Sequence, residues 1–264
     1  MIMTEIFSLK GKVALVTGAT GYLGKQIALS LAEAGAEVII QGRNKIKVER
    51  FVTELRARGF DASAGVFDLL DEEATKHFFE VNPLEKLNIL VNNAYAGPGG
   101  TIESSSDHDY TNSYEIGLVS IQRLFNILLP YLRQGHKSDE LASCINIASM
   151  YGLVSPDFSL YENAATTNPP FYGSVKAALI HWTRYAACEF GLEGIRFNSV
   201  SPGPFPNRLA QENKEFMSKL ECKTALGRIG NAEEIKGVIN FLSSNASSFV
   251  TGSNIVIDGG WTSN

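Results

Sequence analysis

Cysteine and histidine are scarce in this sequence, and neither is spaced as in a disulfide framework or a metal centre. The 264 residues include three cysteines and four histidines, without a CxxC pair or an HExxH-like cluster. An odd number of scattered cysteines does not indicate a set of structural disulfides. The lack of clustered ligands also argues against zinc, and we therefore expect no metal site.

Long apolar runs and an excess of positive charge are also missing. No run approaches the roughly 20 apolar residues that a membrane-spanning helix requires, and the first residues lack the apolar core of a signal peptide. The formal net charge of −5 argues against nucleic acid as a partner, because phosphate backbones are usually bound by basic surfaces. We therefore expect a cytoplasmic protein that binds a small molecule and neither nucleic acid nor a membrane.

Short apolar runs rich in β-branched residues alternate with stretches of helical periodicity. We predict strands at 12–17, 37–41, 62–67, 88–93, 144–148, 196–200 and 254–257. We predict helices at 21–34, 45–58, 107–133, 171–190, 208–221 and 231–243. This alternation predicts an α/β fold with three α/β/α layers, in which helices cover both faces of a Rossmann-type, doubly wound parallel sheet of about seven strands. Residues 1–264 are expected to form a single domain.

The first predicted strand runs directly into a turn with three evenly spaced glycines. Gly18, Gly21 and Gly24 are followed by a predicted helix. Glycine permits a tight turn and lets a pyrophosphate approach bare backbone at a helix N-terminus. A glycine trio alone is a weak motif, but the strand–turn–helix context predicts a dinucleotide site. The alternative is a glycine-rich turn without a ligand.

The end of the second predicted strand has no acidic residue. NAD-binding sites commonly place Asp or Glu here to bind the adenosine ribose hydroxyls, whereas this sequence reads Gln41-Gly42-Arg43-Asn44. A guanidinium at this point can bind the 2′-phosphate of NADP(H) through charge-assisted hydrogen bonds. Arg43 therefore favours NADP(H); the alternatives are a solvated arginine and an NAD(H) site.

Polar residues also follow the third and fourth predicted strands. Asp68-Leu69 ends the third strand, where a carboxylate can accept a hydrogen bond from an adenine amino group. Asn92-Asn93-Ala94 ends the fourth strand, where asparagines can tie strand ends together or contact the cofactor. Each residue is equally compatible with an ordinary turn.

Tyr172 and Lys176 carry the strongest chemical signal. On a helix, residues four apart share a face, so the phenol and the ammonium can point at one site. A nearby cation stabilises a phenolate and lowers the pKa of the phenol, which would let Tyr172 act as a general acid or base. Ser149 follows the fifth predicted strand, and strand ends at this edge of a doubly wound sheet face the ligand. Its hydroxyl can donate a hydrogen bond to a substrate oxygen, or bond to its own turn.

The sequence resembles the short-chain dehydrogenases/reductases of the single-domain type from Lys12 to Trp261. The resemblance rests on the order of the landmarks above, followed by Ser201-Pro202-Gly203, Val250-Thr251-Gly252 and Asp258-Gly259-Gly260. It implies that Ser149 positions the substrate oxygen, that Tyr172 transfers the proton, and that Lys176 binds the nicotinamide ribose and lowers the tyrosine pKa. It also implies a homotetramer or homodimer. The cofactor-binding residues implied by the motifs and the resemblance are Gly18, Thr20, Tyr22, Leu23, Arg43, Asn44, Asp68, Leu69, Asn93, Ala94, Tyr172, Lys176, Pro202 and Gly203.

Two positions depart from this family's pattern. Tyr22 stands in the glycine turn where single-domain members usually carry a glycine, so the pyrophosphate contacts are expected to differ. The family often uses an asparagine on the fourth helix to hold a water for proton relay, and this position falls on Gly117. The relay is therefore absent, rebuilt from water, or served by another residue.

The segment between Ser149 and Tyr172 is longer than is usual in the family. We expect residues 151–170 to lie over the mouth of the active site and to contribute Tyr151, Tyr161 and Asn163 to substrate binding, with Asn168 nearby. Together with Tyr95 after Asn92-Asn93-Ala94, this insert resembles oxidoreductases linked to surface carbohydrate and to flagellin-modifying sugars. The alternative is a surface loop unrelated to specificity. We also expect 204–227 to form a flap over the substrate.

Three functions are consistent with these residues. The first is an NADP(H)-dependent oxidoreductase that interconverts a carbonyl and a secondary alcohol on a sugar-like, polyhydroxylated substrate in carbohydrate metabolism. The second is a reductase of 3-oxoacyl thioesters. The third, suggested by Gly117 and the altered glycine turn, is a cofactor-binding sensor or scaffold with little turnover. The presence of Ser149, Tyr172 and Lys176 together favours an enzyme.

Overall fold

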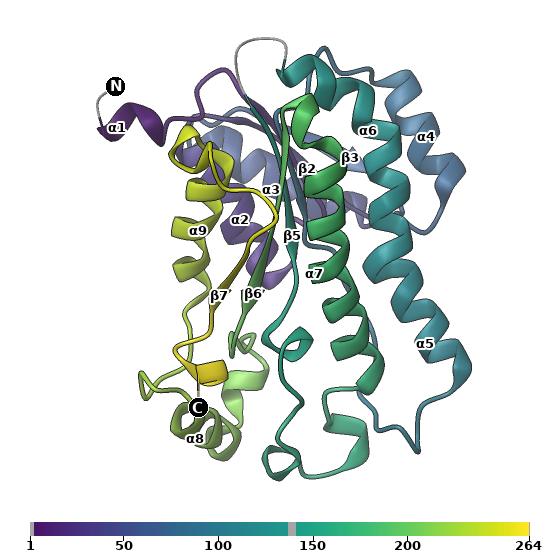
Figure 1. Ribbon diagram of the computed structural model, residues 1–264, viewed down its shortest axis with the longest axis vertical. Helices are drawn as coiled ribbons and strands as arrows, with labels where there is room; N and C mark the ends of the chain where they lie inside the picture. Colours follow the sequence, from purple (N-terminus) through teal and green to yellow (C-terminus); the bar gives the residue numbers. More distant parts are fainter. Residues whose placement is uncertain (1–2, 137–140, 264) are drawn as a thin grey trace.

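A computed structural model describes residues 3–136 and 141–263, and its centre is one parallel sheet (Figure 1). In these residues seven strands pair in the order β3-β2-β1-β4-β5-β6-β7, and every neighbouring pair is parallel. The strands are β1 (Val13–Val16), β2 (Glu37–Gly42), β3 (Ala62–Val66), β4 (Ile89–Asn92), β5 (Ala142–Ile147), β6 (Ile195–Pro202) and β7 (Asn254–Ile257). The predicted three-layer, doubly wound fold is confirmed.

Helices cover both faces of the sheet. They are α1 (Met3–Ile6), α2 (Tyr22–Glu33), α3 (Lys45–Ala57), α4 (Glu72–Val81), α5 (Asp107–Tyr114), α6 (Ser120–His136), α7 (Pro170–Phe190), α8 (Lys214–Lys223) and α9 (Ile235–Ser243). One buried cluster joins α2, α3 and α9 to the sheet, and a second joins α4, α6 and α7 to the opposite face. Because both faces are covered, all residues of β4, β5 and β6 are buried.

Helix α4 is the clearest error of the sequence-based prediction, which placed no helix between the third and fourth strands. Its start is set by Asp71, whose side chain accepts a hydrogen bond from the backbone N–H of Ala74 at 2.9 Å, and by two glutamates in its first turn. Such an N-cap and acidic first turn stabilise a helix N-terminus. The capping pattern therefore predicts this helix, although only Thr75 and Phe79 are buried on it.

Two further predicted helices differ from the structure. The long helix predicted at 107–133 is divided into α5 and α6 by a π-helical turn at Glu115–Val119, a feature that often marks functional sites. The helix predicted at 208–221 begins later: α8 starts at Lys214, and only a short 3-10 turn at Ala210–Glu212 precedes it. The side chain of Asn213 caps α8 by accepting from the N–H of Phe216 at 3.0 Å, which fixes the later start.

The topology places several loops at one edge of the sheet. The carboxyl ends of β1, β2 and β3 lead into the glycine turn, Arg43 and Asp68, and those of β4 and β5 lead into Asn93 and Ser149. Because parallel strands share a direction, their carboxyl ends bring these residues together. No helix in the described part of the chain is long and apolar enough to cross a membrane.

Candidate active site

The glycine turn after β1 has the backbone conformation that a bare-backbone phosphate site needs. Gly18 has a positive φ of 60°, and a Cβ atom on it would lie 2.9 Å from the Cα of Ala94. A Cβ on Gly24 would lie only 2.2 Å from the carbonyl oxygen of Gly18. The first glycine is therefore required by conformation and space, and the third by the close approach of α2 to the turn.

Residues at the end of β4 hold the turn in place. The side-chain amide of Asn93 donates to the carbonyl oxygens of Thr17 and Gly18, at 3.0 and 3.2 Å. The hydroxyl of Thr17 accepts from the backbone N–H groups of Asn93 and Ala94, at 2.9 and 3.1 Å. Gln41 adds a third support, because its side-chain oxygen accepts from the N–H of Gly18 at 3.0 Å. Asn93 was expected to tie strand ends together or to contact the cofactor, and these hydrogen bonds tie the end of β4 to the end of β1.

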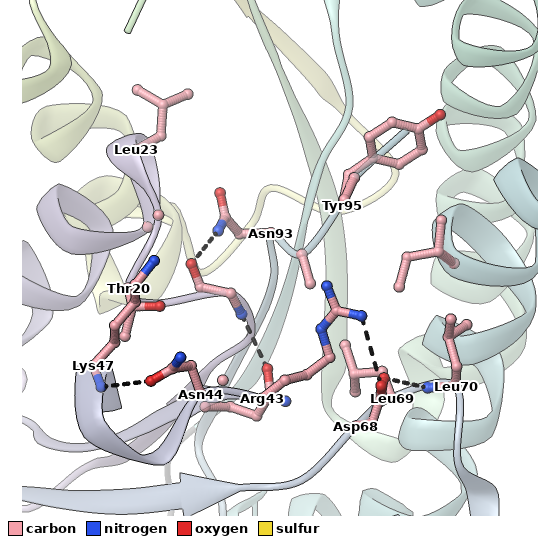
Figure 2. Close-up of a pocket in the computed structure, with 18 of the residues that line it drawn as sticks. Thr20, Leu23, Arg43, Asn44, Lys47, Asp68, Leu69, Leu70, Asn93 and Tyr95 are labelled. Carbon is pink, nitrogen blue, oxygen red and sulfur yellow. Dashed lines mark hydrogen bonds and ion pairs between the residues drawn. The ribbon is translucent and has the colours of Figure 1, made fainter. Parts of the chain in front are cut away.

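A cavity of about 550 Å³ lies beside the glycine turn (Figure 2). Ten of the residues expected to bind the cofactor line it: Gly18, Thr20, Tyr22, Leu23, Arg43, Asn44, Asp68, Leu69, Asn93 and Ala94. Tyr172, Lys176, Pro202 and Gly203 are not among its lining residues. The cavity extends instead to Tyr95, Asn112 and Ile116, so its wall continues from the glycine turn toward α5 and the π-helical turn.

Arg43 extends across this cavity toward Asp68 (Figure 2), with 3.6 Å between its Nη1 and a carboxylate oxygen. Its side chain is 63% exposed, so the ion pair is a weak surface contact. Lys47, which the sequence analysis did not select, lines the same cavity. It lies in the first turn of α3, which Asn44 caps by accepting from the N–H of Lys47 at 3.0 Å. Two cations and a helix N-terminus therefore meet here, which suits an anion.

Ser149, Tyr172 and Lys176 lie together beyond Tyr95. The hydroxyl of Ser149 accepts from the backbone N–H of Tyr151 at 3.1 Å, as the turn-bonding alternative describes, and it also lowers the pKa of the Tyr172 phenol. The Lys176 Nζ lies 5.7 Å from the centroid of the Tyr172 ring. The hydroxyl of Ser149 therefore both bonds to its own turn and lowers the pKa of the Tyr172 phenol.

Lys176 is deeply buried, with an exposed fraction of 4%. Its Nζ donates to the carbonyl oxygen of Ile147, the last residue of β5, at 2.7 Å. Burial penalises the charged form and lowers the pKa of Lys176 to about 8. An ammonium with this pKa remains mostly charged at neutral pH.

The pKa of Tyr172 departs from its ordinary value in the direction opposite to the expected one. Burial raises it, which outweighs the hydrogen bond from Ser149 that lowers it, and the neighbouring Tyr95 raises it further. The overall direction is therefore upward, and the lowering effect expected of Lys176 stays a prediction. A raised pKa keeps Tyr172 protonated near neutral pH, which is the state required of a proton donor.

The insert 151–170 packs against α8. Tyr151, Leu160 and Tyr161 belong to a buried cluster with Met217 and Leu220 of α8. The hydroxyls of Tyr151 and Tyr161 are hydrogen-bonded at 2.9 Å. A second cavity, of about 220 Å³, lies between Tyr161 and α8.

The predicted substrate residues of the insert lie in different surroundings. The backbone of Tyr151 lies against α7 next to Tyr172, because a Cβ on Gly173 would lie 2.7 Å from the carbonyl oxygen of Tyr151. The side chain of Asn163 accepts from the N–H of Thr166 at 3.1 Å and caps its own 3-10 turn. The buried side-chain oxygen of Asn168 has no hydrogen-bond partner within the described ranges. Tyr151 therefore lies beside α7 next to Tyr172, whereas the side chain of Asn163 is hydrogen-bonded within its own 3-10 turn.

The segment after β6 contacts the glycine turn. Pro202 is the last residue of β6, and a Cβ on Gly203 would lie 2.4 Å from the Cα of Asp258. The side-chain amide of Gln211 donates to the hydroxyl of Tyr22 at 3.2 Å. The segment expected to form a flap is therefore connected to the substituted position of the glycine turn.

Potential metal ligands do not gather in the part of the chain that the structure describes. No group of three or more His, Cys, Asp or Glu side chains that could hold a metal ion occurs among these residues. The three cysteines are free.

Comparison with known proteins agrees with this arrangement. The family model described as enoyl-(acyl carrier protein) reductase matches residues 18–262. A tropinone reductase homologue of Arabidopsis thaliana is 33% identical over 269 residues, covering 98% of this chain and 95% of the relative. The rhamnolipids biosynthesis 3-oxoacyl-[acyl-carrier-protein] reductase of Pseudomonas aeruginosa is 33% identical over 264 residues, covering 98% and 99%.

A solved structure shows the same likeness in three dimensions. The crystal structure of a gluconate 5-dehydrogenase from Burkholderia cenocepacia, in complex with NADP and tartrate, has a TM-score of 0.88 and 26% sequence identity to this chain, with 100% of both chains covered. The sequence landmarks, the sheet order and these matches agree over nearly the whole length. The chain therefore belongs to the short-chain dehydrogenase/reductase family.

Proposed function

We propose that this protein is an NADP(H)-dependent oxidoreductase that interconverts a carbonyl group and a secondary alcohol by hydride transfer. One observation carries the proposal: Tyr95 lines the cavity beside the glycine turn, and its ring contacts both Tyr172 and Lys176. Tyr95 thus connects the phenol and the ammonium to the cavity that the glycine turn lines. Residues 1–264 would form the single catalytic domain.

The residues present fit a dinucleotide with a 2′-phosphate. The glycine turn offers backbone N–H groups without a Cβ at Gly18. At the α3 end of the cavity, Arg43 and Lys47 flank the N-terminus of that helix. That end contains no acid at the position that would bind unmodified ribose hydroxyls, so NADP(H) is favoured over NAD(H). Solved relatives described as complexes with NADP support this choice.

The side chains divide the remaining chemistry among them. Tyr172 donates a proton to the substrate oxygen during reduction and accepts it during oxidation. The hydroxyl of Ser149 donates a hydrogen bond to the same oxygen. Lys176 donates one N–H to Ile147, and an ammonium has two further donors that can bind ribose hydroxyls. When bound, the nicotinamide supplies or accepts the hydride.

The substrate is proposed to be sugar-like or otherwise polyhydroxylated. Support comes from Tyr151, whose hydroxyl is hydrogen-bonded to that of Tyr161 and whose backbone carbonyl lies beside Gly173, the residue after Tyr172. Further support comes from the relative described as a gluconate 5-dehydrogenase. The 3-oxoacyl thioester remains a second candidate because the Pseudomonas aeruginosa relative is described as a 3-oxoacyl-[acyl-carrier-protein] reductase. A cytoplasmic location and a homotetramer or homodimer stay predictions.

The test begins with cofactor binding and ends with turnover. The purified protein is titrated with NADPH and NADH by fluorescence, and tighter binding of NADPH is expected. A panel of ketoses, keto-sugars and 3-oxoacyl thioesters is then assayed by loss of NADPH absorbance. Tyr172→Phe is expected to lose about 100-fold or more of the rate while keeping NADPH affinity. Tyr185→Phe, on the exposed face of the same helix, serves as the control. Full activity of Tyr172→Phe would refute the proton-transfer role.

A further inference from the structure

The most unusual contact of the active site is made by a residue that the motifs did not assign a role. Tyr95, the third residue after β4, packs its ring edge-on against Tyr172, with 4.9 Å between the ring centroids. The Lys176 Nζ lies 5.1 Å from the centroid of the Tyr95 ring, slightly closer than it lies to Tyr172. Figure 2 shows Tyr95 at the end of the cavity remote from Lys47. One ring therefore contacts both members of the proton-transfer pair.

The hydroxyl of Tyr95 holds the ring in this position. It is hydrogen-bonded to the hydroxyl of Ser113 on α5 at 2.8 Å. Ser113 in turn donates to the carbonyl oxygen of Phe171 at 3.2 Å, directly before Tyr172 at the start of α7. The ring is thus anchored between α5 and α7 rather than left on a free loop. A part-buried hydroxyl pair of this kind restricts the orientation of the ring.

The space that the ring occupies lies directly above Gly117. A Cβ on Gly117 would lie 2.9 Å from one methyl carbon of Val175 and 3.4 Å from Cε2 of Tyr95. Gly117 is the middle residue of the π-helical turn. A larger side chain at this position would compete with Tyr95 and Val175 for the same volume. The absence of a side chain at 117 and the presence of a ring at 95 therefore belong together.

The buried ammonium of Lys176 forms no ion pair with an acidic side chain in the described ranges. The titratable groups around the site are phenols: Tyr172 on α7, Tyr95 after β4, and Tyr151 after β5, whose pKa is raised in part by Tyr172. Asp157 in the insert acts electrostatically on Tyr151, and not on Lys176. Among the residues that the structure describes, no carboxylate lies within ion-pair distance of the lysine, and the ammonium contacts one carbonyl and two ring faces.

We propose that Tyr95 is a positioning residue whose ring face holds the Lys176 ammonium charged and in place beside Tyr172, in the volume left open by Gly117. The attraction arises because the face of an aromatic ring carries negative electrostatic potential, and it is strongest where water is excluded. Tyr95 acts through Lys176 and does not itself transfer a proton in the reaction. This role in catalysis rests on the proposed function, but the contact itself can be tested without a substrate.

The first experiment measures the protonation of Lys176 directly. The ¹³Cε chemical shift of Lys176, assigned by its loss in Lys176→Met, is followed against pH in the parent, in Tyr95→Leu and in Tyr95→Phe. Tyr95→Leu is expected to lower the titration midpoint by about one pH unit, since a desolvated cation–π contact has roughly that value. Tyr95→Phe keeps the ring and is expected to stay within about 0.3 units of the parent. An unchanged midpoint in Tyr95→Leu would overturn the proposal, as would an equal shift in both variants.

A second set of variants keeps the shape of the ring while weakening its negative face. Phenylalanine with one, two and five fluorine atoms is placed at position 95 by nonsense suppression. The Lys176 midpoint is expected to fall stepwise with fluorination, whereas a role in packing alone predicts no trend. This series remains informative even where Tyr95→Leu does not fold. Because neither measurement uses turnover, a wrong substrate assignment would leave both results valid.

Discussion

The side-chain amide of Gln211 donates a hydrogen bond to the hydroxyl of Tyr22 across 3.2 Å, and so connects the segment after β6 to the glycine turn. Gln211 is held in place by a second bond, from its Nε2 to the carbonyl oxygen of Pro206 at 2.8 Å. Tyr22 is the position that departs from the usual glycine of the family. The larger side chain therefore gains a contact that a glycine could not make.

This contact is expected to slow the release of the cofactor. Gln211→Leu and Tyr22→Phe each remove the hydrogen bond, and NADPH should then dissociate about 2- to 10-fold faster, in line with the net value of one hydrogen bond. Stopped-flow fluorescence with excess unlabelled NADP⁺ as the chase measures the rate. Glu212→Gln, at the exposed neighbouring position, is the matched control and should behave as the parent. Identical dissociation rates in all four proteins would show that the contact does not close the site.

Arg43 and Lys47 are expected to select the phosphorylated cofactor. Arg43→Gln and Lys47→Gln should each weaken NADPH binding about tenfold, because a charge-assisted hydrogen bond to phosphate is lost, while NADH binding changes little. Fluorescence titration with both cofactors measures the two affinities. Lys45→Gln is the control, because Lys45 lies at the same helix start but is not among the residues that line the cavity. Equal losses for NADH and NADPH would place the two cations away from the 2′-phosphate.

Gly117 is expected to tolerate no side chain. In Gly117→Ala the new methyl would lie 2.9 Å from Val175, and overpacking of this kind costs about 1–3 kcal/mol, even though alanine is the better helix former. Thermal unfolding should therefore show a midpoint lower by several degrees. Gly237→Ala in α9 is the control, because its Cβ would meet nothing within 4 Å, and this variant should be as stable as the parent or more so. A stabilised Gly117→Ala would show that the space above Gly117 is open.

The sequence predicts the sheet and the landmarks of the site well, because these are local patterns. Each predicted strand lies at or within a few residues of a strand of the sheet, since short β-branched runs between helical stretches have few other interpretations. Ten of the expected cofactor residues line one cavity, because each follows a strand at the same edge of the sheet. Helix α4 was missed because its apolar residues are few and adjacent, although its acidic cap is visible in the sequence.

The residues that the sequence analysis missed depend on contacts through space. Tyr95 is a single ring after a strand, and only the fold brings it against Lys176 and above Gly117. Tyr95 was noted only as part of a resemblance and Gly117 only as a departure from the family pattern, and nothing local relates the two positions. The upward shift in the pKa of Tyr172 likewise follows from burial, which the spacing of Tyr172 and Lys176 does not reveal.

Lys176 is expected to reduce the stability of the fold in a pH-dependent way. Burial lowers its pKa from the ordinary lysine value of 10.5 to about 8 in the folded protein, whereas the unfolded chain keeps the ordinary value. Between these two pH values the unfolded state binds more protons, so stability rises with pH across this window. Below about pH 8 both states are charged, and the cost of burying the ammonium is fully present.

Lys176→Met removes that buried charge and is expected to be more stable than the parent at pH 7, by at most about 3 kcal/mol. The gain is reduced by the lost hydrogen bond to Ile147 and by the lost contacts with the two rings. Urea unfolding at pH 7 and pH 10 measures both differences, and the advantage of the variant should shrink at the higher pH because the parent lysine is then largely neutral. The same variant should lose activity, since a group retained for function often lowers stability. A Lys176→Met protein less stable than the parent at pH 7, or a difference independent of pH, would show that the fold accommodates the ammonium without cost.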